Sequence, residues 1–381
     1  MKVAFRADAS LQMGSGHVMR CLTLADALKA RGAQCHFISR AHPGHLLETI
    51  HQRGYKVNSL VAPVLRAQEA IKKIVTKEPD PQQEPVHAAW LGSTWQADVQ
   101  ETAAVLASLQ PDWLVVDHYA LDQHWEEVLA PHYRKLMVID DLADRHHCCD
   151  LLLDQNLGRQ PEHYVPWVPA HCRVLTGPQY ALLRPEFAAL RPYSLQRRQA
   201  RPALRQLLIT MGGVDQPNAT GQVLQAFKSC SLPADCQITV VMGLTAPWLQ
   251  NVRELAALMP WPTEVVVNVN DMARRMADSD LVIGAAGSTS WERCCLGLPT
   301  LMVVLADNQK EAAAHLEHAG AAHCLSLNDQ LRQQIQDRLI LLLNQREQLS
   351  QMSICASEIT DGKGVEQIVA AMTSAKQQNL R

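Results

Sequence analysis

Short runs of apolar, β-branched residues alternate along this chain with stretches whose apolar positions recur every three or four residues. The runs predict strands and the periodic stretches predict helices, an alternation typical of βαβ units in a parallel sheet. The strands expected in the first half are Lys2–Arg6, Gln34–Ser39, Trp113–Asp117, Leu136–Asp140 and Leu151–Asp154. Those expected in the second half are Gln206–Met211, Gln237–Met242, Glu264–Asn268, Leu281–Gly284 and Thr300–Leu305. The fold class is therefore α/β, with two Rossmann-like domains that we expect to face each other across a ligand cleft.

A polar segment separates the two halves. Residues Arg191–Pro202 include two prolines, many arginines and few large apolar side chains, a composition that favours a linker. We therefore expect an N-terminal domain over 1–190, a linker over 191–203 and a C-terminal domain over 204–381. The proline-rich stretch Glu78–Pro85 predicts an insertion in the first domain, and Trp90–Gly92 are candidates to pack it against the domain body.

Composition excludes several classes of function. The 381 residues carry 35 Lys+Arg against 38 Asp+Glu, a net charge of -3, and only 5% are aromatic, which argues against a nucleic-acid binder. No apolar run reaches the ~18 residues of a membrane helix, and the first residues lack the apolar region of a signal peptide, so no stable membrane insertion is expected. Eleven cysteines without a Cys-x-x-Cys pair indicate a reducing, cytoplasmic location. His146–Cys149 lack metal-ligand spacing, so no metal site is expected.

The loop after the first strand carries the strongest candidate chemistry. Asp8 follows the strand, and Gly14 and Gly16 bracket a turn at the start of a helix, where backbone amides form an anion site. His17 lies in the first helical turn, where the helix dipole disfavours the imidazolium and so favours a neutral general base for water. The alternative is a histidine that only packs against the neighbouring loop.

Three loops in the second half are candidates to bind a nucleotide sugar. Gly213 lets the backbone approach a diphosphate, Ser288 offers a hydroxyl to phosphate, and the Glu292 carboxylate can accept hydrogen bonds from ribose hydroxyls. Asn308 and Gln309 could read hydroxyl and acetamido groups of a sugar. The alternatives are that Gly213 lies in a tight turn without ligand, that Glu292 is a first-turn acid favoured by the helix dipole, and that the segment of Asn308 and Gln309 only caps a helix.

Three expected strands of the first domain end in aspartate, at Asp117, Asp140 and Asp154. Strand-end acids often cap structure, but three at one sheet edge favour a polar sugar pocket.

Together these segments resemble one enzyme family, which hydrolyses UDP-2,4-diacetamido-2,4,6-trideoxy-β-L-altropyranose in pseudaminic acid biosynthesis, a route to flagellin glycosylation. The resemblance spans about residues 1–320 and is most specific in Arg6–Leu22. The further matching segments are Val116–Tyr119, Ile139–Arg145, Gly177–Arg184, Gly212–Gly213, Gly284–Ser288 and Asn308–Gln309. The glycine loops also resemble the wider GT-B glycosyltransferases that use UDP-N-acetylglucosamine.

This resemblance implies a GT-B fold whose second domain holds UDP and whose last helix crosses back to the first domain. It implies that His17 is the general base, that Glu292 binds ribose, that Asn308 and Gln309 contact sugar and that Tyr119 lies near the reacting centre. It implies no metal and no other cofactor. The insertion at Glu78–Pro85 is a departure from the shorter family members, and it leaves the identity of the sugar open.

The resulting hypothesis is a hydrolase that releases UDP and free sugar with inversion at the anomeric carbon. One alternative is a glycosyltransferase with the same donor site, and another is a hydrolysing UDP-sugar epimerase, which needs a further base. A non-catalytic UDP-sugar-binding protein would keep the glycine loops and Glu292 but would not need His17. The oligomeric state is left open.

Overall fold

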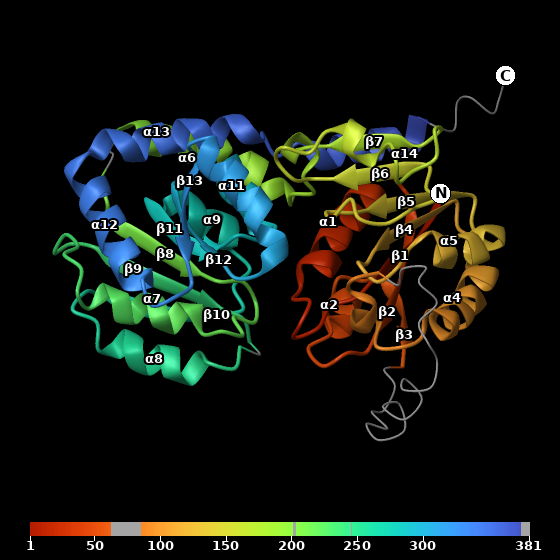
Figure 1. Cartoon of the computed structure of the whole chain (residues 1–381), viewed down its shortest axis with the longest axis horizontal. Helices are drawn as coiled ribbons and strands as arrows, with labels where there is room; N and C mark the ends of the chain where they lie inside the picture. Colours follow the sequence, from red (N-terminus) through yellow and green to blue (C-terminus); the bar gives the residue numbers. More distant parts are fainter. Residues whose placement is uncertain (62–84, 201–202, 245, 375–381) are drawn as a thin grey trace. The chain divides into compact units, whose positions relative to one another are not determined.

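The computed structural model describes residues 1–61, 85–200, 203–244 and 246–374, which divide into two compact units (Figure 1). The first unit comprises Met1–Asp154 and Gln160–Leu175, and the second comprises Gln155–Arg159 and the described residues from Thr176 onward. The predicted insertion lies outside the described residues except for Pro85.

The first unit is built on a seven-stranded sheet with the order β3-β2-β1-β4-β5-β6-β7, parallel from β3 to β6. In Figure 1, α1 and α2 cover one face of this sheet and α4 and α5 the other. The strands are β1 (Lys2–Ala7), β2 (Gln34–Arg40), β3 (Lys56–Leu60), β4 (Trp113–Asp117), β5 (Lys135–Ile139), β6 (Leu151–Asp154) and β7 (Arg173–Thr176). The helices are α1 (Gly16–Ala30), α2 (Leu47–Gln52), α4 (Trp95–Leu109), α5 (Gln123–Leu129) and the short 3₁₀ turns η1 (Ala88–Leu91), η2 (Ala130–His132) and η3 (Pro161–Tyr164).

The second unit is built on a six-stranded parallel sheet with the order β10-β9-β8-β11-β12-β13. The strands are β8 (Gln206–Thr210), β9 (Gln237–Met242), β10 (Thr263–Val267), β11 (Leu281–Ala285), β12 (Thr300–Val304) and β13 (Ala322–Ser326). The helices are α6 (Pro185–Ala200), α7 (Ala219–Phe227), α8 (Leu249–Ala257), α9 (Met272–Asp278), α10 (Thr289–Cys295), α11 (Lys310–His318), α12 (Leu331–Asn344), α13 (Arg346–Ile359), α14 (Gly364–Ser374), with 3₁₀ turns η4 (Pro178–Tyr180) and η5 (Asp307–Gln309).

Alternate residues of the central strands enter two separate cores. Leu207 and Ile209 of β8 pack with α7, α8 and α12, whereas Leu208 between them packs with α6, α9, α10 and α11. A strand buried on both faces must be apolar at every position, which is why these strands read as continuous hydrophobic runs. The second unit is therefore a doubly wound α/β layer.

Both sheets reverse their winding direction between the first and the fourth strand of the unit. β1 pairs with both β2 and β4, and β8 pairs with both β9 and β11. Ligands of open α/β sheets bind beyond the carboxyl ends of the strands at this switch point. The loops after β1, β4, β8 and β11 are therefore the places to look for a site.

The predicted linker over 191–203 differs from the structure, because Arg191–Ala200 form part of helix α6, which belongs to the second unit. Two arginines of this helix bind it to the rest of the second unit. Arg191 donates to the backbone oxygens of Cys295 and Ser357 at 2.6 and 2.7 Å. Arg198, which is buried, donates to Met276 O at 2.9 Å. The chain passes between the units earlier, at Asp154/Gln155, at Arg159/Gln160 and at Leu175/Thr176.

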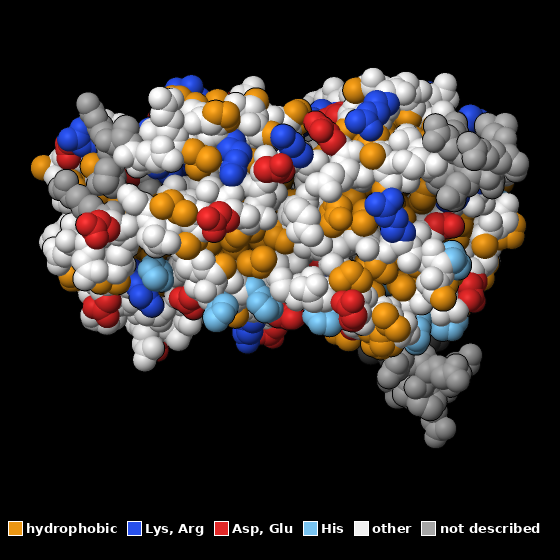
Figure 2. Space-filling model, turned by 90° about the horizontal axis from the view of Figure 1, so that it is seen from above, with side chains coloured by type: hydrophobic (Ala, Val, Ile, Leu, Met, Phe, Trp, Pro, Cys, Tyr) orange, Lys and Arg blue, Asp and Glu red, His pale blue; other side chains and the backbone are white. Residues whose placement is uncertain are grey.

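All ten predicted strands are present, with ends shifted by at most two residues. The sequence patterns missed β3, β7 and β13, which lie at the edges of their sheets. On the face drawn in Figure 2, acidic and basic side chains are intermixed, as the balanced charge predicts. Among the described residues, no helix is both long and apolar enough to span a membrane.

Candidate active site

The loop between β1 and α1 folds into a compact turn that places His17 in the first turn of the helix. Gly14 has a φ of +75° and donates its N–H to Ser10 O at 2.8 Å, which closes the turn. Ser15, the N-cap residue of α1, makes no side-chain hydrogen bond to the helix. Gly16 is the first helical residue, so the predicted positions of both glycines and of His17 are confirmed, while anion binding there stays a prediction.

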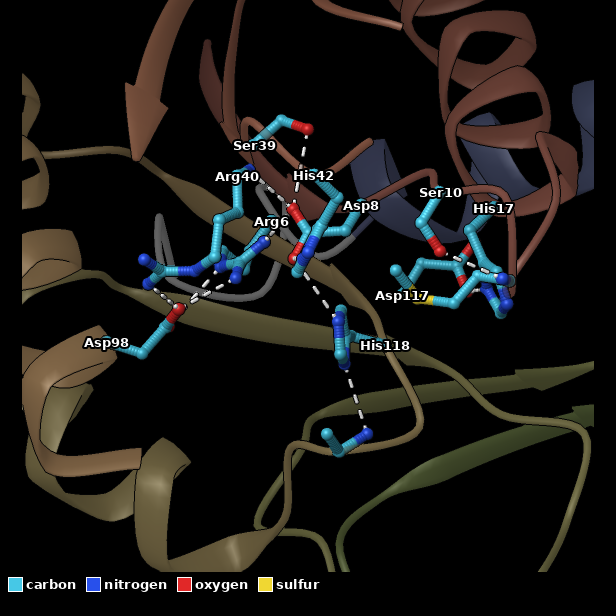
Figure 3. Close-up of polar contacts among 12 residues, drawn as sticks. Arg6, Asp8, Ser10, His17, Ser39, Arg40, His42, Asp98, Asp117 and His118 are labelled. Carbon is cyan, nitrogen blue, oxygen red and sulfur yellow. Dashed lines mark hydrogen bonds and ion pairs between the residues drawn. The ribbon is translucent and has the colours of Figure 1, made fainter. Parts of the chain in front are cut away.

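His17 forms a close pair with the aspartate that ends β4. His17 Nδ1 lies 2.6 Å from Asp117 Oδ1, and both side chains are buried (Figure 3). Burial alone would raise the pKa of Asp117, but Arg20 and His17 outweigh this effect and hold the pKa below its usual range. An ionised carboxylate can only accept, so in the neutral imidazole Nδ1 carries the proton and Nε2 the lone pair. That tautomer is the one a general base requires.

Arg20, one turn further along α1, fixes Asp117 and extends the network. Its Nε lies 2.6 Å from Asp117 Oδ2 and its Nη1 lies 2.8 Å from Asp141 Oδ2. Tyr119 donates its hydroxyl to the same Asp141 oxygen at 2.8 Å, and its ring meets the His17 ring edge-on with centroids 4.7 Å apart. The family resemblance implied that Tyr119 lies near the reacting centre, whereas the sequence analysis missed Arg20 and the pairing of Asp117 with His17.

Asp8 lies inside a buried ionic cluster. Its carboxylate accepts from Arg6 Nη1 at 2.6 Å and from the backbone N–H of Arg40 at 2.7 Å (Figure 3). His118 Nε2 and His42 Nε2 lie 3.2 and 3.5 Å from its other oxygen. Burial raises the pKa of Asp8, but Arg6 and the two histidines more than offset that and keep the pKa well below its usual range. These contacts join the loops after β1, β2 and β4; substrate binding by Asp8 stays a prediction.

The three strand-end aspartates have different partners. Only Asp117 contacts His17. Asp140 and Asp154 both accept from the hydroxyl of Tyr164, at 3.0 and 2.9 Å, and Asp140 also pairs with Arg145 at 2.7 Å. All three carboxylates are buried. Asp140 and Asp154 thus share Tyr164 rather than His17, and the sugar pocket expected from the three aspartates stays a prediction.

In the second unit, the loop after β8 passes close to the loop after β9. Gly212 has a φ of +88°, and Gly213 is exposed. A Cβ added at Gly243 would collide with Gly213 O, so this backbone approach requires glycine. The N-terminus of α7 is already occupied, because Asp215 accepts from the N–H groups of Ala219 and Thr220 at 2.8 and 2.9 Å. An incoming anion would therefore use other amides.

The loop after β11 is held by a buried arginine. Arg293 of α10 donates through Nη2 to Ala285 O at 2.6 Å and to Ser290 Oγ at 2.8 Å. Burial lowers the pKa of Arg293 to about 10. Gly284 is needed there, because a Cβ would collide with the guanidinium. Ser288 is exposed and, as the N-cap residue of α10, makes no side-chain hydrogen bond to that helix.

Glu292, also on α10, is largely buried and lies beside Arg184. Arg184 Nη2 lies 3.7 Å from its Oε1. Burial raises the pKa of Glu292 to about 7, with Arg184 opposing the shift. Asn308 and Gln309 lie in η5 after β12, where Asn308 is exposed and Gln309 accepts from Leu305 N at 3.1 Å. Ribose binding by Glu292 and sugar contact by Asn308 and Gln309 stay predictions.

No group of three or more His, Cys, Asp or Glu side chains in the described ranges is arranged to hold a metal ion.

This chain is similar to known glycosyltransferases in part of its sequence and in its fold. Residues 207–368 match the glycosyltransferase family 28 C-terminal domain. MurG of Acinetobacter baumannii has the same architecture, with a TM-score of 0.69 at 17% identity over 98% of this chain and 99% of that one. The chain has the GT-B fold. The predicted fold class is thereby confirmed.

Two relatives align with most of the chain. The UDP-2,4-diacetamido-2,4,6-trideoxy-beta-L-altropyranose hydrolase of Campylobacter jejuni is 25% identical over 321 residues, which are 84% of this chain and 97% of that protein. An uncharacterized protein of Methanocaldococcus jannaschii is 24% identical over 318 residues, 82% of this chain. The chain spans only 57% of the length of that second relative.

Proposed function

We propose that this protein hydrolyses a UDP-linked 2,4-diacetamido-2,4,6-trideoxy hexose and releases UDP and the free sugar. The observation that carries the proposal is the His17–Asp117 pair, with Nδ1 2.6 Å from Oδ1. A carboxylate that fixes the imidazole tautomer serves an enzyme that needs a base, whereas a protein that only binds UDP-sugars does not need it. The 25% identity to the Campylobacter jejuni hydrolase, over almost its whole length, supports the choice of substrate.

The mechanism has one proton transfer and one displacement. Nε2 of His17 takes a proton from water while the water oxygen forms a bond to the anomeric carbon. The bond between that carbon and the UDP oxygen breaks, and the electron pair leaves with the diphosphate. Asp117 stabilises the imidazolium that forms. Attack from the face opposite the leaving group inverts the anomeric centre. The amide groups of the second unit's loops supply the diphosphate site, and Glu292 accepts from the ribose.

A proton-NMR time course tests this proposal. The purified protein is incubated with UDP-2,4-diacetamido-2,4,6-trideoxy-β-L-altropyranose and EDTA, beside a sample with UDP-N-acetylglucosamine. We expect UDP and free diacetamido sugar to appear in the first sample, with the inverted anomer present before mutarotation, and no change in the second. The His17→Asn variant should still bind UDP while turnover is lost. Unchanged turnover in this variant would remove His17 from the mechanism.

A glycosyltransferase remains the second candidate, favoured by the match of residues 207–368 to a glycosyltransferase domain. In that case His17 would deprotonate an acceptor hydroxyl rather than water. The same time course separates the two functions, because a transferase consumes neither UDP-sugar until an acceptor is added.

A further inference from the structure

We propose that His87 and Trp90, together with Tyr119, form the wall of a sugar subsite that packs against the apolar face of the substrate's pyranose ring. This inference rests on the proposed function, since it concerns the sugar half of the same substrate. The three rings form one cluster, with centroid distances of 4.4 Å for His87–Trp90, 5.5 Å for His87–Tyr119 and 5.8 Å for Trp90–Tyr119. Tyr119 in turn meets His17 at 4.7 Å.

The short turn η1 (Ala88–Leu91) carries Trp90, has His87 as its N-cap residue and is anchored by its last residues. Leu91 is buried in the core that α4 forms with the sheet, 2% exposed. Gly92 ends the turn with a φ of +64°, and a Cβ there would lie 2.5 Å from Cε1 of His42. Because Leu91 and Gly92 are fixed, the turn holds the rings of His87 and Trp90 beside Tyr119.

The rings are placed where the sugar must lie. Trp90 and His87 are only partly buried, so part of each side chain is accessible to a ligand, whereas Tyr119 is 7% exposed. A water on Nε2 of His17 must come within about 3 Å of the anomeric carbon to react. Since the His17 and Tyr119 rings are 4.7 Å apart, the pyranose ring attached to that carbon lies near Tyr119, and the Trp90 ring lies beside Tyr119 at 5.8 Å.

The chemistry of the wall selects a class of sugar. Aromatic faces bind C–H and methyl groups well, but a hydroxyl pressed against them loses its hydration without gaining a partner. A pyranose with a methyl group at C6 or with acetamido methyl groups therefore fits this wall better than a fully hydroxylated hexose. One methyl-sized group in such a pocket changes kcat/KM by about tenfold or more.

Substitutions at Trp90 test the subsite. In Trp90→Ala, we expect KM for UDP-2,4-diacetamido-2,4,6-trideoxy-β-L-altropyranose to rise about tenfold, with the Kd for UDP unchanged by calorimetry. Trp90→Phe keeps an aromatic face and should stay within threefold of wild type. Trp167→Ala is the matched control, because Trp167 also packs on a histidine, His146, with centroids 4.9 Å apart. A KM within twofold of wild type in Trp90→Ala overturns the inference.

A binding measurement separates failure of the subsite from failure of the proposed function. Calorimetry with the UDP-sugar and with UDP alone needs no turnover. If the wild type binds the UDP-sugar more tightly than UDP and Trp90→Ala loses that difference, the subsite stands even where no hydrolysis occurs. If wild type and Trp90→Ala show the same difference in affinity between the UDP-sugar and UDP, the subsite is wrong even where the enzyme hydrolyses the substrate.

Discussion

Arg20 binds both carboxylate oxygens of Asp117, with Nε 2.6 Å from Oδ2 and Nη2 2.7 Å from Oδ1. The candidate base His17, which shares that carboxylate, lies one turn earlier on the same helix. Asp117 is therefore held from two positions of α1, and its register opposite Ala7 of β1 brings it to the end of that strand. The orientation of His17 depends on this carboxylate, so changes at Asp117 should act on chemistry more than on binding.

In Asp117→Asn, the amide can turn its NH₂ group toward His17 Nδ1 and so stabilise the wrong tautomer. We expect kcat for UDP release to fall about 100-fold or more, since general base catalysis contributes 10² to 10⁴. The Kd for UDP, measured by calorimetry, should stay within twofold. A kcat within threefold of wild type would contradict the role of Asp117.

Arg20→Ala should destabilise the first unit, because it leaves Asp117 buried with one partner fewer. Breaking a buried ion pair costs about 3 kcal/mol or more of unfolding free energy. Urea denaturation checks this loss. Arg31→Ala, at an exposed position just after the same helix, is the control and should change the unfolding free energy by less than about 0.5 kcal/mol. Equal effects of the two variants would mean that Arg20 has no special contribution.

Glu292 should make stability fall as pH rises. The pKa of Glu292 is about 7 in the fold because of burial, against an ordinary value of 4.5, so between these values the folded state binds more protons than the unfolded state. Stability is then lost from pH 4.5 to about 7 and stays lower above it. Glu292→Gln should be up to about 3 kcal/mol more stable than wild type at pH 8 and equal to it near pH 4.5.

The control for this pH dependence is Glu186→Gln. Glu186 pairs with the same Arg184, at 2.9 Å, but is more exposed. Thermal unfolding of both variants at pH 5 and pH 8 checks the prediction, and calorimetry should show weaker UDP binding for Glu292→Gln alone. A stability gain at pH 8 that is shared by Glu186→Gln would assign the effect to Arg184 instead.

Gly243→Ala should disturb the loop after β8, because the added Cβ collides with Gly213 O, a backbone atom that cannot rotate away. We expect both the melting temperature and the affinity for UDP to fall. Gly287→Ala is the control for stability, since a Cβ there meets nothing within 4 Å and the melting temperature should not change. An unchanged melting temperature in Gly243→Ala would show that the loop can adjust without cost.

The sequence patterns were sufficient for the central strands and insufficient for the sheet edges. Strands such as β4 (Trp113–Asp117) are buried on both faces, so the first four positions of β4 are all apolar and the run stands out. β3 has the sequence Lys56-Val57-Asn58-Ser59-Leu60 and is mostly exposed, so its polar positions resemble a loop. The helix α6 was missed for another reason: its residues Arg191 and Arg198 donate to backbone carbonyls more than 70 residues away in sequence.

In the candidate site, too, some features follow from local sequence and others do not. The turn at Gly14 and the position of His17 follow from local signals, because glycine conformation and helix periodicity are properties of neighbouring residues. The pairing of His17 with Asp117 joins residues 100 apart, and nothing in the spacing of a histidine and a strand-end aspartate distinguishes Asp117 from Asp140 or Asp154. Only the strand order, which puts β4 beside β1, makes that choice.

The arginines of α6 also affect the order in which parts of the protein can fold during synthesis on the ribosome. The first sheet is encoded by consecutive strands that end at Thr176, so its unit can fold while synthesis continues. Helix α6 is made next, yet Arg191 must wait for Ser357 O, supplied more than 160 residues later. During that interval the nascent chain carries a helix whose cationic side chains lack their final acceptors, and truncation before α13 would leave it in this state permanently.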